Sequence, residues 1–299
     1  MTERPDVVLI AGPTASGKSA LALEFARALD GVVVNADSMQ VYDGLSVLTA
    51  RPTENEMAGI EHRLYGHVAA ERSYSVAAWL KDATAVLAEI RARNKVAVFA
   101  GGTGLYFKAL EEGLSPMPAI DPAIRETWRE AADAKPESLH GALQARDPEA
   151  ASVLEPGDTQ RLVRALEVFE ATGRSILDWQ RQHREGSALN DLRTEKWLIE
   201  PERSELHERI ERRVDHMIAA GALEEVEAFL ARGLPSRVPV MRAIGVPQLA
   251  AHLHGEIGID EAAMRIKAAT RQYAKRQTTW FRHQKGPGWQ GHPGWTADI

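Results

Sequence analysis

The stretch Gly12-Pro13-Thr14-Ala15-Ser16-Gly17-Lys18-Ser19 directly follows the apolar run Val7-Val8-Leu9-Ile10-Ala11. Its glycines, lysine and serine have the spacing of a phosphate-binding loop. In such a loop backbone N–H groups surround an anion, the lysine adds positive charge and the serine hydroxyl can ligate Mg²⁺. Leu21, Phe25 and Leu29 follow at helical spacing. Because a helix N-terminus also attracts anions, the stretch predicts a phosphate site between a buried strand and a helix.

The composition is that of a globular protein. The chain has 299 residues, 44% of them hydrophobic, which allows one large domain or two moderate ones with a sizeable core. No apolar run is long enough to cross a bilayer, and the first residues lack the layout of a signal peptide, so we expect a cytoplasmic protein without membrane association. The absence of cysteine excludes disulfides and thiolate metal sites.

Charge is unevenly distributed along the chain. The formal net charge is −6, yet the segment from Met264 to Lys285 holds seven basic residues and no acidic one. Tyr273, Trp280 and Phe281 lie between these basic residues. Basic and aromatic side chains on one helix suit phosphate contacts and base stacking. The segment therefore favours a nucleic-acid partner despite the acidic total.

Two further apolar runs predict strands of the same sheet. The β-branched run 31–36 ends at Asp37, and the run 96–100 ends in Gly101-Gly102-Thr103-Gly104. The segment 75–94 between them has the apolar spacing of a helix. This is the strand–helix–strand order of a parallel sheet.

The carboxyl ends of parallel strands form a ligand-binding edge, so we expect Asp37 and Thr103 to lie beside Lys18. Asp37 could instead simply cap the next turn, and the glycines before Thr103 could form only a tight turn. Residues 49–66, rich in turn formers and charges, predict an irregular loop that could lie over the site.

The middle of the chain predicts a helical domain. Residues 121–184 contain no strand-like run, and the expected helices are 122–134, 136–146, 158–172 and 175–184. The run 196–199 then returns to the sheet, and the Gly- and Pro-containing residues 286–299 predict a mobile tail. We expect an α/β fold. It combines a P-loop NTPase-like parallel-sheet core flanked by helices, residues 1–114 plus 193–299, with an all-helical insertion domain, residues 115–192.

Two pairs of arginines are candidates for anion contacts. Arg161 and Arg164 fall in the first turn of a predicted helix, where the helix dipole favours acidic residues. Arg209 and Arg213 lie one turn apart on a later predicted helix. An external anion would explain both pairs. The alternative is ion pairing within the chain, with Glu167 for the first pair and with Glu205 and Glu208 for the second.

Six stretches, in this order along the chain, resemble the tRNA dimethylallyltransferases, also called tRNA isopentenyltransferases. They are Gly12 to Ser19, Asp37-Ser38-Met39-Gln40-Val41-Tyr42, Gly101-Gly102-Thr103-Gly104-Leu105-Tyr106, Gln160-Arg161-Leu162-Val163-Arg164-Ala165-Leu166-Glu167, Met241-Arg242-Ala243-Ile244-Gly245 and Lys275-Arg276-Gln277-Thr278-Thr279-Trp280-Phe281-Arg282. Two places depart from the family pattern. Leu48 stands where glycine is usual, and Val246-Pro247 replaces an aromatic-basic pair.

The resemblance implies transfer of a dimethylallyl group from its diphosphate to the exocyclic amine of the adenosine immediately 3′ of the anticodon in certain tRNAs. The amine is a poor nucleophile, so a base must take its proton, and negative charge builds on the departing diphosphate. We expect a monomer that binds dimethylallyl diphosphate and the tRNA anticodon stem-loop, with Mg²⁺ as cofactor.

The resemblance also implies roles for individual residues. The expected catalytic residues are Asp37 as base, Thr103, Arg213 and Lys18. The expected diphosphate ligands are Gly12, Pro13, Thr14, Ala15, Ser16, Gly17, Lys18, Ser19 and Arg209, with Ser19 also ligating the metal ion. The expected tRNA contacts are Asp37, Ser38, Met39, Gln40, Arg125, Gln160, Arg161, Leu162, Val163, Arg164, Arg242, Arg271, Lys275, Arg276 and Arg282.

Two other functions remain open from the sequence. A small-molecule P-loop kinase would use the same loop for ATP, with Asp37 deprotonating an acceptor hydroxyl. A nucleotide-dependent switch that binds RNA would also need the loop and the basic helix. Both require room for a third phosphate. The basic, aromatic-bearing segment has no evident purpose in a metabolite kinase.

Overall fold

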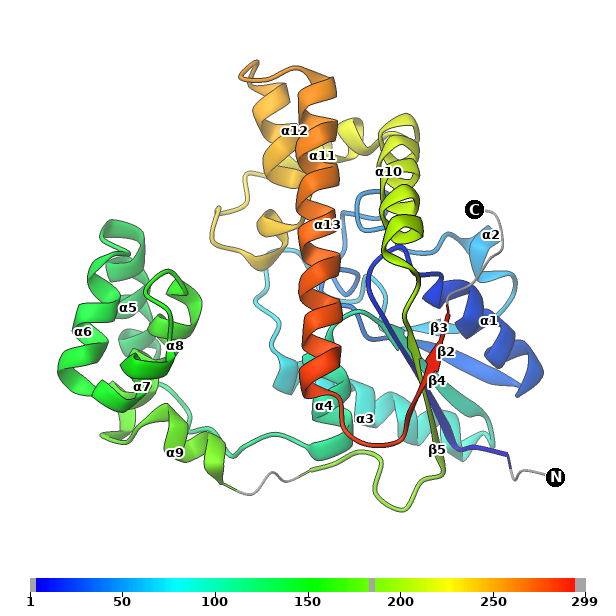
Figure 1. Ribbon diagram of the computed structural model, residues 1–299, viewed down its shortest axis with the longest axis horizontal. Coiled ribbons are helices and arrows are strands. Elements are labelled where there is room, and N and C mark those ends of the chain that lie inside the picture. The colour runs from blue at the N-terminus through cyan, green and yellow to red at the C-terminus, as the bar shows by residue number, and fades with distance from the viewer. Residues whose placement is uncertain (1–3, 183–185, 294–299) are drawn as a thin grey trace. The chain divides into compact units, whose positions relative to one another are not determined.

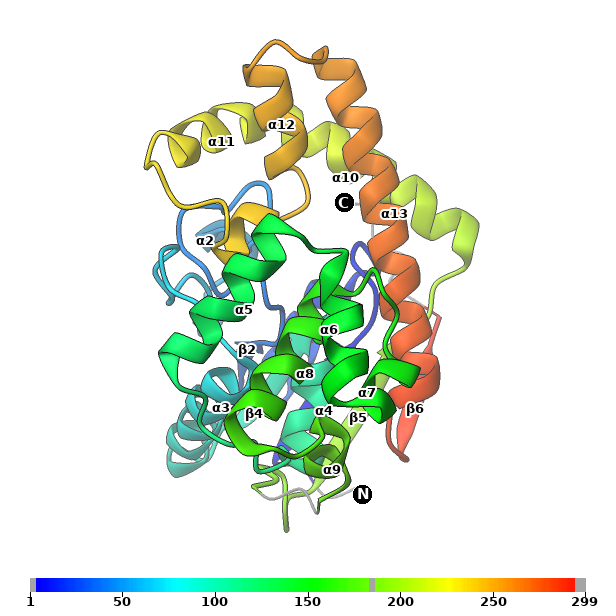
Figure 2. The same cartoon turned by 90° about the vertical axis from the view of Figure 1, so that its left-hand side faces the viewer.

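The computed structural model describes residues 4–182 and 186–293. The chain divides into two compact units, Met1–Glu111 with Ala188–Ile299 and Glu112–Ser187 (Figures 1 and 2). Each unit has a hydrophobic core built from its own residues. Within the described residues, no helix is long and apolar enough to cross a membrane.

The first unit is built on a six-stranded sheet with the order β3-β2-β4-β1-β5-β6, in which every neighbouring pair is parallel. The strands are β1 (Val7–Ala11), β2 (Gly31–Asn35), β3 (His62–Arg63), β4 (Val96–Gly101), β5 (Thr194–Ile199) and β6 (Trp289–His292). All residues of β1, β2 and β4 are buried. Strands covered on both faces read as continuous apolar runs, which is why the sequence reveals them.

Helices cover both faces of this sheet. The helices of this unit are α1 (Lys18–Ala28), α2 (Glu54–Met57), α3 (Val76–Ala92), α4 (Gly104–Glu112), α10 (Arg203–Ala219), α11 (Ala222–Leu230), the 3₁₀ turn η1 (Pro239–Arg242), α12 (Val246–Leu253) and α13 (Ile259–Gln284), of which α1 and α3 pack directly on the strands. Val8 and Ile10 of β1 pack with α1, whereas Val7 and Leu9 share a core with α3. This alternation places the phosphate loop between the two layers, at the carboxyl end of β1.

The second unit contains five helices among its described residues. They are α5 (Pro122–Ala134), α6 (Ser138–Arg146), α7 (Pro148–Val153), α8 (Thr159–Thr172) and α9 (Ile176–Arg181). Their apolar faces meet around Trp128, Leu139, Leu143 and Leu166. The short α7, capped by Asp147, is not expected from the sequence. The helix expected to reach residue 184 ends at Arg181, and residues 183–185 lie outside the described residues.

Two expectations about loops are wrong. The segment 49–66 is not wholly irregular, because it contains α2, with a capping box between Thr53 and Glu56, and the edge strand β3. Residues 289–292 form β6, which pairs with β5 and whose Trp289 ring lies 5.6 Å from that of Phe107. Both strands are too short to produce a sequence pattern. The expectation of a mobile tail beyond residue 293 lies outside the described residues.

The helix α11 is also absent from the sequence-based expectations. It follows Gly221, and its Val226 and Phe229 are buried in the core of the first unit. In the family motif that runs from Met241 to Gly245, the first two residues belong to the turn η1, and α12 begins directly after the motif, at Val246.

Candidate active site

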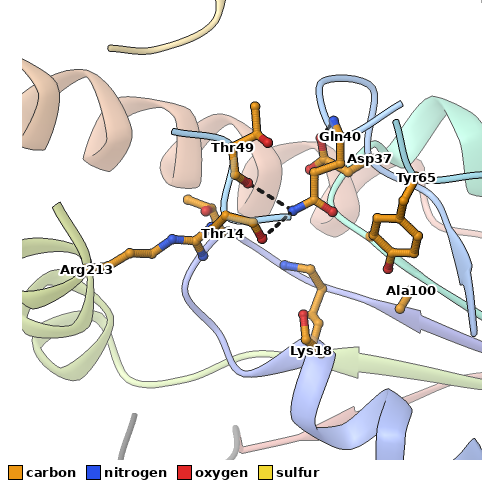
Figure 3. A pocket seen from close by; sticks show the side chains of 11 residues that line it. Thr14, Lys18, Asp37, Gln40, Thr49, Tyr65, Ala100 and Arg213 are labelled. Carbon is orange, nitrogen blue, oxygen red and sulfur yellow. Dashed lines mark hydrogen bonds between the residues drawn. The ribbon is translucent and has the colours of Figure 1, made fainter. Parts of the chain in front are cut away.

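The phosphate loop connects β1 to α1 as the sequence predicts. Gly17 caps α1 with φ +90°, a conformation in which glycine avoids the strain of other residues. The Nζ of Lys18 donates a hydrogen bond to the carbonyl oxygen of Pro13 at 2.5 Å, within the loop. Thr14, Lys18 and Ser19 line a cavity at the carboxyl edge of the sheet (Figure 3).

The cavity collects residues from distant parts of the chain. Its lining consists of Thr14, Lys18, Ser19, Asp37, Gln40, Thr49, Ala50, Tyr65, Ala100, Gly101 and Arg213. The sequence-based hypothesis that Asp37 and Lys18 are neighbours is therefore confirmed. Arg213 reaches the same cavity from α10, as Figure 3 shows. A parallel sheet places ligands at this edge, outside the carboxyl ends of its strands.

Asp37 is held by Asn35, the last residue of β2, which is fully buried. The Nδ2 of Asn35 donates to the carbonyl oxygens of Asp37 and Leu64, each at 3.0 Å, and its Oδ1 accepts the Asp37 N–H at 2.9 Å. The Asp37 Oδ1 accepts the N–H of Met39 at 2.9 Å. Asp37 therefore does cap the next turn, but it uses one oxygen, and the second remains available to accept a proton.

Positive charge dominates the cavity. Burial lowers the pKa of Lys18 to about 7; the negative charge of Asp37 opposes this shift and the positive charge of Arg213 adds to it. Burial also lowers the pKa of Arg213. Two half-buried cations and a single carboxylate in the cavity lining leave a site that favours an anionic ligand. Such shifted groups in a cavity are typical of functional sites.

Thr103 lies at the carboxyl end of β4 but is not among the residues that line the cavity. Its Oγ1 accepts the N–H of Ser38 at 2.9 Å, and its hydroxyl shares a hydrogen bond with Tyr273 of α13. Burial raises the pKa of Tyr273, so that this hydroxyl stays protonated. Thr103 thus connects the turn after Asp37 to the C-terminal helix.

Gln277 of α13 joins the two glycine-rich loops, a role that the sequence does not reveal. Its Nε2 donates to the Gly102 carbonyl oxygen at 2.9 Å, and its Oε1 accepts the Thr14 N–H at 2.8 Å. A Cβ on Gly102 would lie 2.0 Å from the Gln277 Nε2, so only glycine permits this approach. The bond spans 263 residues, and no local pattern could indicate it.

Arg209 and Arg213 do not act as a pair. Arg209 is buried, forms an ion pair with Glu205, and lies 3.5 Å from the Ser16 carbonyl oxygen. The alternative of pairing with Glu205 is therefore correct for Arg209, which supports the back of the phosphate loop. Arg213 alone lines the cavity.

Five residues of the cavity wall are not among the sequence-based candidates: Thr49, Ala50, Tyr65 and, at the end of β4, Ala100 and Gly101. Thr49 and Ala50 contribute carbonyl oxygens that accept hydrogen bonds from Gln40, and Tyr65 follows the edge strand β3. Burial raises the pKa of the Tyr65 hydroxyl. A two-residue strand before Tyr65 is too short to mark it as a strand-end residue.

The expected tRNA contacts of the second unit differ in exposure. Arg125 and Gln160 are exposed. Arg164 pairs with Glu167 at 3.3 Å, as the ion-pair alternative states, whereas Arg161 pairs with Asp158 at 3.4 Å, a partner that the alternative did not name. Leu162 is fully buried in the core and Val163 packs against it. The assignment of Leu162 as a tRNA-contacting side chain is therefore corrected, because it faces the neighbouring helices.

The basic residues of the first unit that were expected to contact tRNA also fall into two groups. Arg271 of α13 pairs with Glu211 of α10 at 3.2 Å. The exposed ones are Arg242, Lys275, Arg276 and Arg282, of which Arg276 lies over the Tyr273 ring at 5.7 Å. These four exposed side chains form no ion pair with another residue that the structure describes, so they can meet a polyanion directly.

The residues that could hold a metal ion are few. Across residues 4–182 and 186–293 there is no cluster of three or more histidines and carboxylates. Ser19 lines the same cavity as Asp37, and its hydroxyl is a possible metal ligand. This donor set fits Mg²⁺, which uses few protein ligands and takes most of the others from substrate phosphates and water.

Together, the parallel sheet, the phosphate loop and the carboxylate beside two cations define an α/β enzyme of the P-loop class. The chain matches the family model described as IPP transferase over residues 40–284 and the isopentenyl transferase model over residues 5–74. It is 54% identical to a tRNA dimethylallyltransferase of Agrobacterium fabrum, over 95% of both chains. A tRNA dimethylallyltransferase of Chelativorans is 55% identical over 95% of this chain and 98% of the relative. The chain belongs to the tRNA dimethylallyltransferase family.

Solved structures agree with this assignment. A full-length tRNA isopentenylpyrophosphate transferase from Bacillus halodurans is 32% identical with a TM-score of 0.68, covering 96% of this chain and 89% of that one. A eukaryotic dimethylallyltransferase acting on tRNA is 26% identical with a TM-score of 0.75, covering 92% and 69%.

The two departures from the family pattern lie at one contact. A Cβ on Gly245 would lie 2.3 Å from the Leu48 Cδ1, and Val246 is buried directly after that glycine. Leu48 therefore packs the loop before Thr49 against the start of α12.

Proposed function

We propose that this protein transfers a dimethylallyl group from dimethylallyl diphosphate to the exocyclic amine of the adenosine immediately 3′ of the anticodon in certain tRNAs, releasing diphosphate. The observation that carries the proposal is the cavity that holds Asp37 together with Lys18 and Arg213. It combines a proton acceptor with two cations that suit a departing diphosphate.

In the reaction, the amine nitrogen forms a bond to the allylic carbon while the carbon–oxygen bond to the diphosphate breaks. The free oxygen of the Asp37 carboxylate takes one amine proton, which makes the nitrogen a better nucleophile. The electron pair of the broken bond leaves with the diphosphate. Lys18, Arg213 and the loop N–H groups stabilise that charge, each donor contributing roughly 3 kcal/mol.

Members of a prenyl transferase family generally require a divalent metal ion, and we propose Mg²⁺. The Ser19 hydroxyl would hold it at the edge of the cavity. The ion would neutralise part of the diphosphate charge.

Two of the expected site residues contribute indirectly. Thr103 holds the turn after Asp37 through its hydrogen bonds to Ser38 and Tyr273. Arg209 supports the backbone of the phosphate loop at Ser16.

For tRNA, we propose that basic and polar residues of both units bind the anticodon stem-loop. The basic and polar residues are Arg125, Gln160, Arg161, Arg164, Arg242, Arg271, Lys275, Arg276 and Arg282, of which Arg164 and Arg271 are half-buried; the apolar Val163 and, beside the cavity, Ser38, Met39 and Gln40 complete the proposed contacts. The target base must leave its stack to reach Asp37, at a cost of a few kcal/mol. We further propose that the protein acts as a monomer in the cytoplasm.

A transfer assay tests the proposal. The protein is incubated with unmodified tRNA and labelled dimethylallyl diphosphate without nucleotide, and in parallel with ATP. Label in the tRNA is the expected result. Consumption of ATP without labelled tRNA would instead support a kinase or a nucleotide-dependent switch, the alternatives that the family assignment does not favour.

A further inference from the structure

A carboxylate far from the chemistry holds the loop that precedes the cavity residues Thr49 and Ala50. The Oε1 of Glu225, on α11, accepts the N–H groups of Ser46 at 2.6 Å and Val47 at 2.9 Å and the Ser46 hydroxyl at 2.9 Å. Its Oε2 accepts the N–H of Leu48 at 2.9 Å. One side chain therefore satisfies three consecutive backbone donors of a loop that lies 177 to 179 positions away. Such charge-assisted bonds are stronger than neutral ones.

The same loop orients the side chain of Gln40. The Nε2 of Gln40 donates to the carbonyl oxygens of Thr49 at 2.9 Å and Ala50 at 3.0 Å (Figure 3). Carbonyl oxygens can only accept hydrogen bonds, so the amide atom that faces them must be the nitrogen. Both N–H donors of Gln40 are thereby used. Its oxygen is the only polar atom of the side chain that can serve a ligand in the cavity, which Gln40 lines.

An adenine amine carries two hydrogens, and in the proposed reaction Asp37 takes only one of them. The second needs an acceptor if the amine is to hold a fixed orientation toward the allylic carbon. Gln40 follows Asp37 by three residues and lines the same cavity. Its amide oxygen is an acceptor of the required kind, and the two loop carbonyls prevent the amide from turning over.

We propose that Glu225 is a positioning residue for this reaction: through the loop 46–50 it fixes the Gln40 amide so that its oxygen accepts a hydrogen bond from the exocyclic amine of the target base. The inference rests on the proposed function. Glu225 itself does not line the cavity, so it acts only through the loop. The Lys18 side of the cavity does not depend on these bonds.

The test compares Glu225→Ala with Glu224→Gln, which changes an exposed glutamate on the same helix. Glu225→Gln retains the side-chain volume but presents an N–H group to the Leu48 N–H, and it serves if the alanine variant fails to fold. We expect amide exchange at residues 46–48 to quicken at least about tenfold in Glu225→Ala. We also expect kcat/KM for tRNA to fall about ten- to a hundredfold, with the KM for dimethylallyl diphosphate changed less than about twofold.

A double-mutant cycle with Gln40→Ala separates positioning from general destabilisation. If Glu225 acts through Gln40, Glu225→Ala lowers kcat/KM for tRNA by less than about threefold once Gln40 is alanine. Equal losses in both backgrounds, or a KM for dimethylallyl diphosphate that rises as much as kcat/KM for tRNA falls, would overturn the role of Glu225. Absence of transfer by the wild-type protein would overturn the proposed function instead.

Discussion

At the scale of single residues, Asp37 serves both structure and chemistry. One oxygen caps the turn that carries Met39, and the other remains available in the cavity. Asp37→Asn keeps an oxygen for the cap but removes the base. We expect transfer to fall about a hundredfold or more while tRNA affinity changes little. Labelled transfer and filter binding measure the two quantities, and a variant that retains activity within about tenfold of wild type would show that Asp37 is not the base.

Lys18 makes diphosphate binding depend on pH. Its pKa is lowered to about 7, so above pH 7 the free protein loses this charge, and binding of an anion must restore the proton. The affinity for inorganic diphosphate should therefore fall as pH rises above 7, by up to about tenfold per pH unit. Calorimetric titrations from pH 6 to 9 measure this dependence.

Lys18→Met is the control for that titration, because diphosphate itself also changes its charge with pH and only the variant lacks the lysine's ionisation. The variant should bind diphosphate weakly, and its affinity should not show the additional decline above pH 7 that Lys18 causes in the wild type. Matching pH profiles of the two proteins would show that Lys18 stays charged throughout.

At the scale of elements, α13 has two faces with different tasks. Gln277 and Tyr273 contact the glycine-rich loops, whereas Lys275 and Arg276 are exposed. Because a helix has about 3.6 residues per turn, Lys275 lies on nearly the opposite side from Tyr273 and Gln277, whereas Arg276 lies next to Tyr273 and extends over its ring. The contacts that hold the phosphate loop are thus made by the same helix that offers positive charge to a polyanion.

The exposed face predicts a salt effect. Replacing both Lys275 and Arg276 by alanine should weaken tRNA binding and reduce the slope of log Kd against log salt by about one for each lost phosphate contact. Lys267→Ala on the same helix is the matched control, because Lys267 pairs with Asp215 at 2.6 Å. Binding measured from about 50 to 200 mM salt gives the slopes. Equal slopes for the double variant and wild type would place tRNA elsewhere.

At the scale of the whole molecule, the two units have separate cores. Leu162 belongs to the core of the helical unit and Phe99 to that of the sheet unit. Leu162→Ala should destabilise the helical unit by about 2–5 kcal/mol, because it leaves a cavity among packed side chains. We expect faster amide exchange in α6 and α8, weaker tRNA binding and unchanged affinity for inorganic diphosphate. Phe99→Ala is the reciprocal control, because it should quicken amide exchange in the sheet unit. If Leu162→Ala quickened amide exchange in β4 as much as in α6 and α8, the two units would unfold together.

The sequence predicts the residues of the site better than their partners. Lys18 and Asp37 each follow an apolar run that must be a buried strand, and strand ends in a parallel sheet meet, so their proximity follows from local patterns. The burial of Arg209 and Leu162 does not follow in this way. An arginine on a helix has the same local sequence whether it pairs with Glu205 or reaches a ligand, and neighbours from distant segments decide between them.

The sequence by itself determined the phosphate loop, the strands β1, β2 and β4, and the family, because each depends on spacing within a short segment. Only the tertiary structure decided that Gln277 joins the two loops, that Glu225 holds the loop 46–48, and that β3 and β6 complete the sheet. These contacts connect segments that are far apart in the chain. Their energies depend on how the core packs rather than on local propensity, and no spacing along the chain can reveal them.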